Sequence, residues 1–218
     1  LKYIRPVSDL HLEWVTSSNT LVQVSEAFDK QVPLDDRDAE SLLVIAGDTS
    51  SHSRQAMHAA VRAGQRFRYV VLLPGNHEHY DHFPEDWNQA IASARINKPS
   101  LGTGSNVFLV GHDEHKWLFL PGGVRILATT LWTECKDEVL PPSNFSDFRW
   151  IKGHNLNTCR NSFLAAKAEI SRFLNQTRGE ATMVVATHHL PSFSLGDPRY
   201  NGSPLNPYYA SNLNAFLT

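Results

Sequence analysis

Short runs of hydrophobic residues, each bounded by polar or turn-forming residues, recur along the chain and predict β-strands. Two of them, 41–46 and 69–73, are hydrophobic at nearly every position, which is typical of strands buried on both faces of a parallel sheet. Pro6 cannot donate a ladder hydrogen bond, so the first strand should lie at a sheet edge or turn Pro6 toward a side without a partner. The predicted strands are 2–10, 41–46, 69–73, 107–110, 117–120, 124–131 and 182–187.

Hydrophobic residues at helical spacing predict helices between these strands, over 57–67, 87–96 and 160–175. In the first half, the order strand, connection, strand, helix, strand is that of a right-handed parallel unit, which gathers its loops at the carboxyl ends of the strands. In the second half, the link Pro121-Gly122-Gly123 predicts an antiparallel hairpin. A long proline-containing loop over 191–207 and a last helix that begins at a capping Ser211 complete the predicted order.

Composition and charge indicate one globular α/β domain. The chain has 218 residues and a mass of 24.5 kDa, with 41% hydrophobic residues. Twenty Lys and Arg against 22 Asp and Glu give a formal net charge of −2, so no basic field attracts long nucleic acid. The hydrophobic runs are far shorter than the ~20 residues of a membrane span, and no secretory signal opens the sequence. We therefore expect a soluble, cytoplasmic protein.

Two residue types change this picture. Cys135 and Cys159 are too few for a disulfide scaffold and lack the C-x-x-C spacing, so reduced thiols are expected. The 11 histidines are unusual, because neutral imidazole is the commonest metal ligand in proteins.

Polar clusters follow four of the predicted strands. They read Asp9-Leu10-His11, Gly47-Asp48, Gly75-Asn76-His77-Glu78 and Thr187-His188-His189. Carboxylate, imidazole and amide groups form a mixed nitrogen and oxygen donor set that suits Mn, Fe or Zn. Asp48 can bridge a pair of ions, which would lie about 3.5–4 Å apart, while Asp9 and His11 hold one ion and Asn76 and His188 hold the other.

These clusters resemble those of the calcineurin-like metallophosphoesterases, in which D-x-H, G-D, G-N-H-E and a later H occur in this order. The matching segments are SDLHLE from Ser8, AGD from Ala46, GNHE from Gly75 and THHLP from Thr187. The segments 128–133 and 144–149 also resemble the T-L-W-T and N-D-x-R stretches of a bacterial branch, which we expect to border the active site. The resemblance implies a four-layer α/β/β/α sandwich of two mixed β-sheets flanked by helices.

The resemblance also implies a function and a role for each site residue. It implies hydrolysis of phosphate mono- or diesters through attack of a metal-bridging hydroxide on phosphorus, at two divalent ions held by Asp9, His11, Asp48, Asn76 and His188. His77 would lie beside the phosphoryl group and either protonate the leaving oxygen or hydrogen-bond the phosphoryl oxygens. His189 would line the pocket, although it could also replace His188 as the ligand.

Further side chains are candidates on chemical grounds alone. Arg149 and Arg199 could bind phosphate or another acidic group of the substrate, and a surface ion pair is the alternative. Glu78 is expected to steady the loop or a ligand histidine, whereas three residues that follow it are expected at the solvated surface: His79, Asp81 and His82. Four aromatic residues could form either a wall for a nucleoside or aryl group or part of the core: Trp132, Tyr200, Tyr208 and Tyr209.

One departure from the family pattern concerns the end of the chain. The family closes its site with a G-H-x-H motif after the T-H element, and no such motif follows Thr187 here. Gly111-His112 and Gly153-His154 precede that element and are not taken as ligands. We therefore expect residues 1–218 to form a single metallophosphoesterase domain that lacks its C-terminal strand and its G-H-x-H motif.

Two alternatives remain open at this stage. The first is a non-catalytic protein-binding scaffold with the same fold, which the absent motif favours and the other ligands disfavour. The second is a nuclease or a cyclic-nucleotide phosphodiesterase; the near-neutral charge disfavours long nucleic acid but not a nucleotide. The expected partner is a small phosphate ester, which could be a nucleotide, with no membrane and no identified protein partner.

Overall fold

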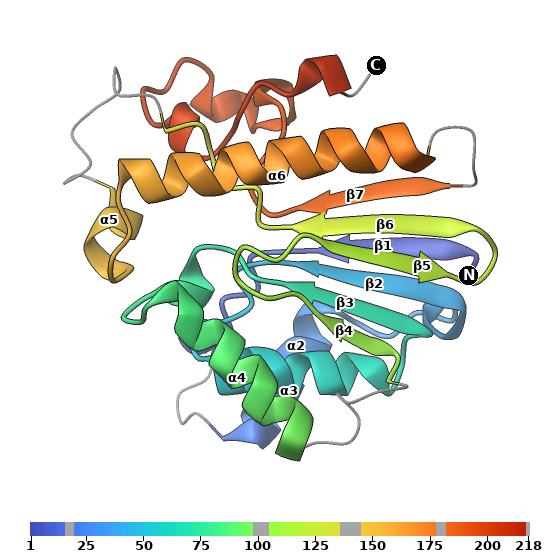
Figure 1. The fold of residues 1–218 in the computed structure, drawn as a ribbon. Coiled ribbons are helices and arrows are strands. Elements are labelled where there is room, and N and C mark those ends of the chain that lie inside the picture. Colours follow the sequence, from blue (N-terminus) through green and yellow to red (C-terminus); the bar gives the residue numbers. More distant parts are fainter. Residues whose placement is uncertain (16–19, 98–104, 136–144, 178–181, 217–218) are drawn as a thin grey trace.

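Two β-sheets lie face to face between two layers of helices (Figure 1). The computed structural model describes residues 1–15, 20–97, 105–135, 145–177 and 182–216. The four layers confirm the expected α/β/β/α sandwich.

The first sheet contains β1 (Tyr3–Val7), β2 (Ser41–Ala46), β3 (Tyr69–Leu73) and β4 (Val107–Leu109), in that order. All of its described pairs are parallel, so the mixed pairing expected of both sheets is confined to the second. β1 lies at the edge of this sheet, as Pro6 predicts. The register places the ends of β1, β2 and β3 level with one another, which brings the loops that follow them together.

The second sheet contains β5 (Lys116–Leu120), β6 (Val124–Thr129) and β7 (Met183–Thr187). β5 and β6 form the expected antiparallel hairpin, and β6 pairs with β7 in parallel. Thr129 and Thr187 are partners at the ends of β6 and β7, so the residues that follow them also leave the sheet side by side.

Alternating side chains of the strands build the core. Leu42 and Val44 point into the space between the sheets, where they meet Ile126. Leu43 and Ile45 pack against the helices that cover the outer face of the first sheet. The two faces of β2 are therefore both buried, as its uninterrupted hydrophobic sequence predicts.

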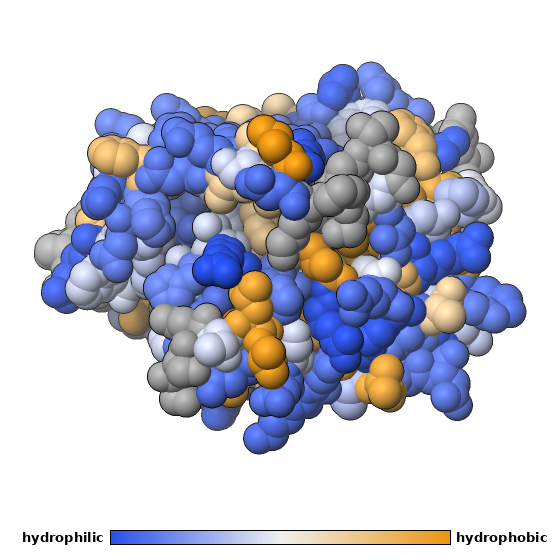
Figure 2. Space-filling model, turned by 90° about the horizontal axis from the view of Figure 1, so that it is seen from below, coloured by the Kyte–Doolittle hydropathy of each residue, from blue (hydrophilic) through white to orange (hydrophobic). Residues whose placement is uncertain are grey.

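The helices of the first layer cover the outer face of the first sheet, and one long helix covers the second (Figure 1). Figure 2 shows the outside of the first layer, where small hydrophobic patches are separated by hydrophilic residues. Sequence patterning missed α2, which begins after Thr20, whose hydroxyl accepts a hydrogen bond from the Gln23 N–H at 3.4 Å. The α-helices are α1 (Leu12–Val15), α2 (Leu21–Gln31), α3 (Ser53–Gly64), α4 (Pro84–Asn97), α5 (Ser146–Trp150) and α6 (Leu156–Thr177).

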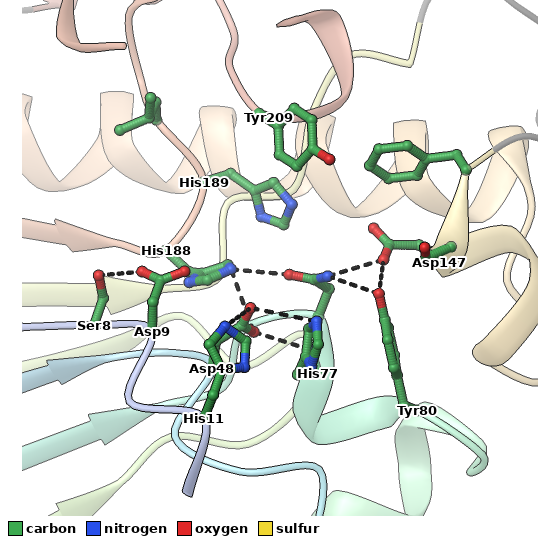
Figure 3. Close-up of a pocket in the computed structure, with 14 residues that line it drawn as sticks. Ser8, Asp9, His11, Asp48, His77, Tyr80, Asp147, His188, His189 and Tyr209 are labelled. Carbon is green, nitrogen blue, oxygen red and sulfur yellow. Dashed lines mark hydrogen bonds and ion pairs between the residues drawn. The ribbon is translucent and has the colours of Figure 1, made fainter. Parts of the chain in front are cut away.

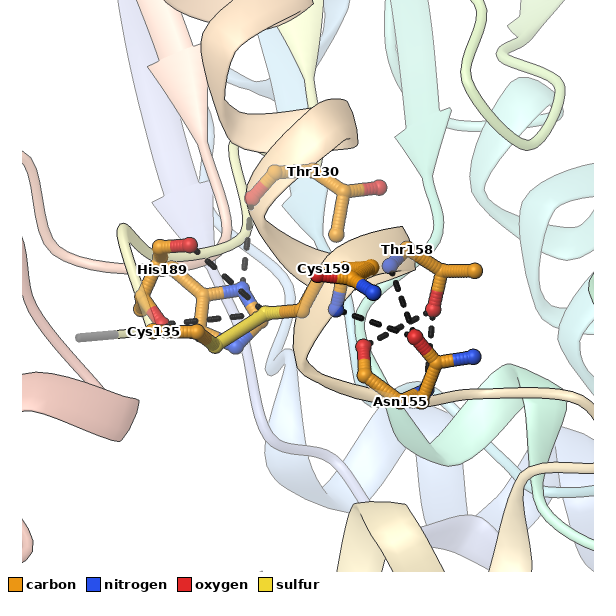
Figure 4. Close-up of a disulfide and its surroundings, with 8 residues drawn as sticks. Thr130, Cys135, Asn155, Thr158, Cys159 and His189 are labelled. Carbon is orange, nitrogen blue, oxygen red and sulfur yellow. Dashed lines mark hydrogen bonds between the residues drawn. A yellow bond between two sulfur atoms is a disulfide. The ribbon is translucent and has the colours of Figure 1, made fainter. Parts of the chain in front are cut away.

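A disulfide joins Cys135, after β6, to Cys159 in the first turn of α6 (Figure 4). The expectation of reduced thiols is therefore wrong for this structure. Both residues are buried, and their Cα atoms lie 6.5 Å apart, within the span of a disulfide. Because 24 positions separate the cysteines, only the packing of α6 against the second sheet brings them together. Disulfides persist mainly in oxidising compartments. With these cysteines paired, reduced thiols no longer support a cytoplasmic location.

Two further expectations concern the last predicted helix and membrane-spanning segments. The helix expected from Ser211 is not formed in the described residues, where Ser211 is buried and only a short 3-10 turn, Asn214–Phe216, follows. Among the described helices, none combines the length and the hydrophobicity that crossing a membrane would require.

Candidate metal centre

The loops that follow β1, β2, β3 and β7 meet at one edge of the sandwich and surround a cavity of about 460 Å³. Figure 3 shows how side chains from these loops point toward one another across it. Seven of the nine residues expected at the site line this cavity: Asp9, His11, Asp48, Asn76, His77, His188 and His189. The other described lining residues are Ser8, Tyr80, Phe145, Ser146, Asp147, Leu190 and Tyr209.

Sharp backbone turns direct the acidic and imidazole groups of the first two loops. Asp9, His11 and Asp48 have positive φ angles of 56°, 43° and 53°, a region that few residues other than glycine adopt. Backbone hydrogen bonds tie the two loops together, from the Asp9 N–H to the Gly47 carbonyl at 3.1 Å and from the His11 N–H to the Asp48 carbonyl at 3.0 Å. The strained turns are therefore held by the neighbouring loop.

Glu78 fastens the loop after β2 to the loop after β3. Its buried carboxylate accepts backbone hydrogen bonds from Asp48 at 2.9 Å, Thr49 at 2.6 Å, Ser50 at 3.3 Å and Gly75 at 2.8 Å. Burial, together with the charge of Asp48, raises the pKa of Glu78 to about 7, against the lowering effect of these N–H groups. The expectation that Glu78 steadies the loop is confirmed.

Asp48 lies at the middle of the cluster. One of its oxygens, Oδ1, accepts a hydrogen bond from the His77 backbone N–H at 2.9 Å, and Oδ2 lies 4.0 Å from Nε2 of both His11 and His77. Only glycine fits at position 75, opposite Asp48, because a Cβ there would collide with Asp48 Oδ1 and lie 2.7 Å from the Asp48 nitrogen.

His188 brings one ring nitrogen close to two oxygen atoms. Its Nδ1 lies 2.8 Å from the carbonyl oxygen of Ala46, which can only accept, so Nδ1 carries a proton. Nε2 lies 2.9 Å from Asn76 Oδ1 and 3.5 Å from Asp48 Oδ1. An imidazole nitrogen, an amide oxygen and a carboxylate oxygen therefore converge, and with a neutral imidazole all three could be ligands of one cation.

Asp147 fixes the orientation of Asn76 that this geometry requires. The amide nitrogen of Asn76 donates to Asp147 Oδ1 at 2.8 Å, and the Tyr80 hydroxyl donates to the same oxygen at 2.8 Å (Figure 3). Burial raises the pKa of Asp147, and these two hydrogen bonds oppose the rise. Sequence patterns assigned no individual role to Asp147 or Tyr80; the signal for Asp147 was its place in the segment 144–149 that was expected to border the site.

Glu13 and His77 form a second polar group beside the first. Glu13 Oε1 lies 3.3 Å from His11 Nδ1 and 3.4 Å from His77 Nδ1. Burial raises the pKa of Glu13, but the hydrogen bonds from both histidines outweigh this effect and lower the pKa to about 2. Burial lowers the pKa of His77, but the hydrogen bond to Glu13 and the charge of Asp48 leave it raised above its ordinary value. Glu13 was part of the matching segment SDLHLE but received no role from the sequence.

Two sets of donor atoms are close enough to hold a metal ion. One ligand atom from each of Asp9, His11 and Asp48 lies within 4.8 Å of the others, and the same holds for His11, Glu13 and His77. No Lys or Arg is found among the described residues that line the cavity, which contains three Asp side chains. The residues therefore fit divalent cations, which would offset the negative charge that an anionic substrate meets in this cavity.

His189 and the two arginines lie differently. His189 is buried, with Nδ1 3.4 Å from the Thr130 carbonyl, and burial and His188 lower its pKa. Arg199 is not among the described residues that line the cavity, and its guanidinium pairs with Asp197 at 2.6 Å. Arg149 is exposed, since positions two residues apart on a helix face different directions and Asp147 faces the cavity.

Other candidates are resolved by their burial. His79 is fully buried, so its expected place at the surface is wrong, whereas Asp81 and His82 are exposed as expected. Trp132 and Tyr208 belong to the core beneath α6, whereas Tyr209 lines the cavity.

Comparisons with known proteins agree with this architecture. The model of the calcineurin-like phosphoesterase family matches residues 6–215. No curated protein matches the sequence significantly. The fold is similar to the crystal structure of phosphopantetheinyl hydrolase from Mycobacterium tuberculosis, with a TM-score of 0.64 and 14% identity over 96% of this chain and 75% of that one.

Proposed function

The chain belongs to the calcineurin-like phosphoesterase family, and from this premise we propose that it hydrolyses phosphate mono- or diesters with the help of two divalent metal ions. One observation carries the proposal: potential metal-ligand atoms of Asp48, Asn76 and His188 converge in a cavity whose described lining has no Lys or Arg. Such a site binds cations, and a phosphate ester is an anion that bound cations would attract.

We assign the two ions to Asp9, His11, Asp48, Asn76 and His188, with Asp48 shared between them. The nitrogen and oxygen donors suit Mn, Fe or Zn. When bound, such ions lower the pKa of water and offset negative charge on the phosphoryl oxygens. Asp147 holds the Asn76 oxygen toward His188, and Glu78 holds the backbone that carries Asp48.

His77 is the residue we propose for proton transfer to the leaving oxygen. Its ring stacks on Tyr80 with centroids 4.2 Å apart, and its Nδ1 is held by Glu13. In its imidazolium form this ring can donate a hydrogen bond to a phosphoryl oxygen or a proton to the departing alkoxide. His189 closes the cavity on the side of Tyr209 (Figure 3).

The test is Mn²⁺-dependent hydrolysis of p-nitrophenyl phosphate and bis-p-nitrophenyl phosphate. We expect release of nitrophenol from at least one ester, loss of activity with EDTA and recovery with Mn²⁺. The ratio of the two rates distinguishes monoesterase from diesterase activity. Failure of the metal-loaded protein to hydrolyse either ester, or activity that survives EDTA, would contradict the proposal.

A further inference from the structure

The segment after His189 builds a second cavity, of about 490 Å³, beside the metal centre. It folds into three 3-10 turns, Phe193–Leu195, Pro198–Tyr200 and Asn206–Tyr208. Leu190 and Tyr209 line both cavities, so the second begins where the first ends. Its volume lies within the range of small-molecule sites, about 300–1,000 Å³.

The wall between the two cavities is fixed by backbone hydrogen bonds. The Leu190 N–H donates to the Tyr209 carbonyl at 3.0 Å, and the Ser211 N–H donates to the Leu190 carbonyl at 3.0 Å. Because Leu190 follows His188 and His189 directly, this ladder sets the position of the second cavity relative to the metal ligands. Figure 3 shows Tyr209 beyond His189, across the first cavity from His11 and Asp48.

The second cavity is lined differently from the first. Its side chains are mainly hydrophobic or aromatic, with neutral amides and a hydroxyl between them. The single ionisable acid of its described lining is Asp197, and both Nε and Nη2 of Arg199 bond to that carboxylate, at 2.9 and 2.6 Å. No free cation in the described lining is available for a second phosphate or another acidic group.

Large aromatic surfaces at this cavity face solvent. Phe193 is 45% exposed, Tyr200 is 60% exposed and Tyr209 is 53% exposed. They are brought to one place by a short segment that also forms the edge of the metal centre. Exposed aromatic residues that rim a cavity next to a reactive site are typical of a binding surface for an organic group.

We propose that the second cavity binds the alcohol part of the phosphate ester, and that the substrate is a phosphate ester of an uncharged, largely apolar or aromatic alcohol. This inference rests on the proposed function. The phosphate lies at the metal ligands, the ester oxygen points toward Leu190 and Tyr209, and the organic group extends over Phe193 and Tyr200. Neutral amides such as Asn201 allow a few polar atoms in that group. A polyanionic alcohol part, as in a nucleic acid strand, does not match this lining.

A series of n-alkyl phosphates tests the inference, because ethyl, butyl and hexyl phosphate differ little in leaving group but greatly in buried apolar surface. We expect kcat/KM to rise with chain length, by up to about fourfold per methylene for full burial. The substitutions Phe193→Ser and Tyr200→Ser should flatten this dependence. Phe119→Ser, which removes an exposed aromatic ring of β5 outside both cavities, is the matched control and should keep it.

The outcomes separate the two proposals. Hydrolysis of every ester at a rate independent of chain length would overturn the subsite and leave the proposed function intact. Absence of hydrolysis throughout the series and with the nitrophenyl esters would overturn the proposed function. Calorimetric titration with hexylphosphonate and ethylphosphonate gives a readout without turnover: we expect tighter binding and a more negative heat-capacity change for the hexyl compound, and equal affinities would overturn the subsite.

Discussion

The two cavities that meet at Leu190 and Tyr209 are built in contrasting ways. The metal centre collects charged and polar groups from the ends of four strands, and buried hydrogen bonds of Glu78 and Asp147 hold them in place. The neighbouring cavity is formed by one continuous segment of 3-10 turns with exposed aromatic side chains. A site that gathers charged side chains needs several elements to hold those side chains in place. A neutral wall that selects a ligand by its shape can be formed by one segment.

This contrast predicts effects of different size for substitutions in the two regions. Changes at the metal centre should affect activity or folding strongly, because each group there has several partners. Changes at the neutral wall should alter the choice of substrate more than the rate of reaction.

The largest expected effect follows Asp48→Asn. An amide has one acceptor oxygen instead of two and no charge, so it cannot bridge two cations well. We expect kcat/KM for the nitrophenyl esters to fall by about 10³-fold or more. Asp36→Asn, at an exposed position outside both cavities, is the matched control and should keep wild-type activity, whereas near wild-type turnover by Asp48→Asn would refute the shared-ligand role.

Glu78→Ala tests whether the metal centre depends on its buried support. The change leaves four backbone N–H groups without their acceptor, which should lower the free energy of unfolding by about 3 kcal/mol. Urea denaturation measures the loss. Glu85→Ala, at an exposed position, should stay within about 0.5 kcal/mol of wild type. An equally small effect of Glu78→Ala would mean that the loops after β2 and β3 keep their positions without the Glu78 carboxylate.

His77→Ala separates proton transfer from metal binding. We expect kcat to fall about 10²-fold while the metal content of the protein is unchanged. The control is His82→Ala, which removes an exposed histidine of the same segment. Loss of metal in His77→Ala would instead make His77 a ligand.

Asp147→Asn probes the positioning of Asn76. An amide at this position removes the negative charge from the oxygen that accepts from both the Asn76 amide and the Tyr80 hydroxyl, so the Asn76 oxygen is held less firmly. Metal affinity should weaken about tenfold, as for other groups that orient ligands. Excess Mn²⁺ should restore most of the kcat; a loss of kcat that no metal concentration reverses would show a different role.

The smallest effect is expected for Arg199→Ala. Its side chain is 78% exposed and already paired with Asp197, so kcat/KM for small phosphate esters should change less than about twofold. A tenfold loss would return Arg199 to the substrate-binding role that its residue type suggests, and would break the contrast between a charged and a neutral cavity.

The sequence predicts which polar residues meet at the cavity better than it predicts the groups that hold them in place. β2 and β3 were predicted to the residue, because uninterrupted hydrophobic runs end at glycine or proline, and their polar successors meet as parallel topology requires. Asp147 and Asn76 are 71 positions apart, and no spacing rule links them. Glu13 lies two residues from His11 and still received no role, because its contact with His77 depends on how two loops pack.

Errors at other positions have the same origin. His79 lies among polar residues in sequence and is buried only because Trp132 and His112 cover it, with ring centroids at 6.0 and 4.9 Å. The disulfide between Cys135 and Cys159 likewise depends on tertiary packing. Local pattern identifies strand ends and the chemistry they carry, whereas burial and long-range partners follow from the assembled fold.

The number of metal ions that the folded chain retains shows whether the cavity is a two-metal site. Protein dialysed against Mn²⁺ and then freed of excess metal should retain about two ions per chain by elemental analysis, and Asp48→Asn should retain fewer. Circular dichroism on the same samples establishes that each protein is folded. A folded wild-type chain that retains no divalent ion after exposure to Mn²⁺, Fe²⁺ or Zn²⁺ would contradict the account.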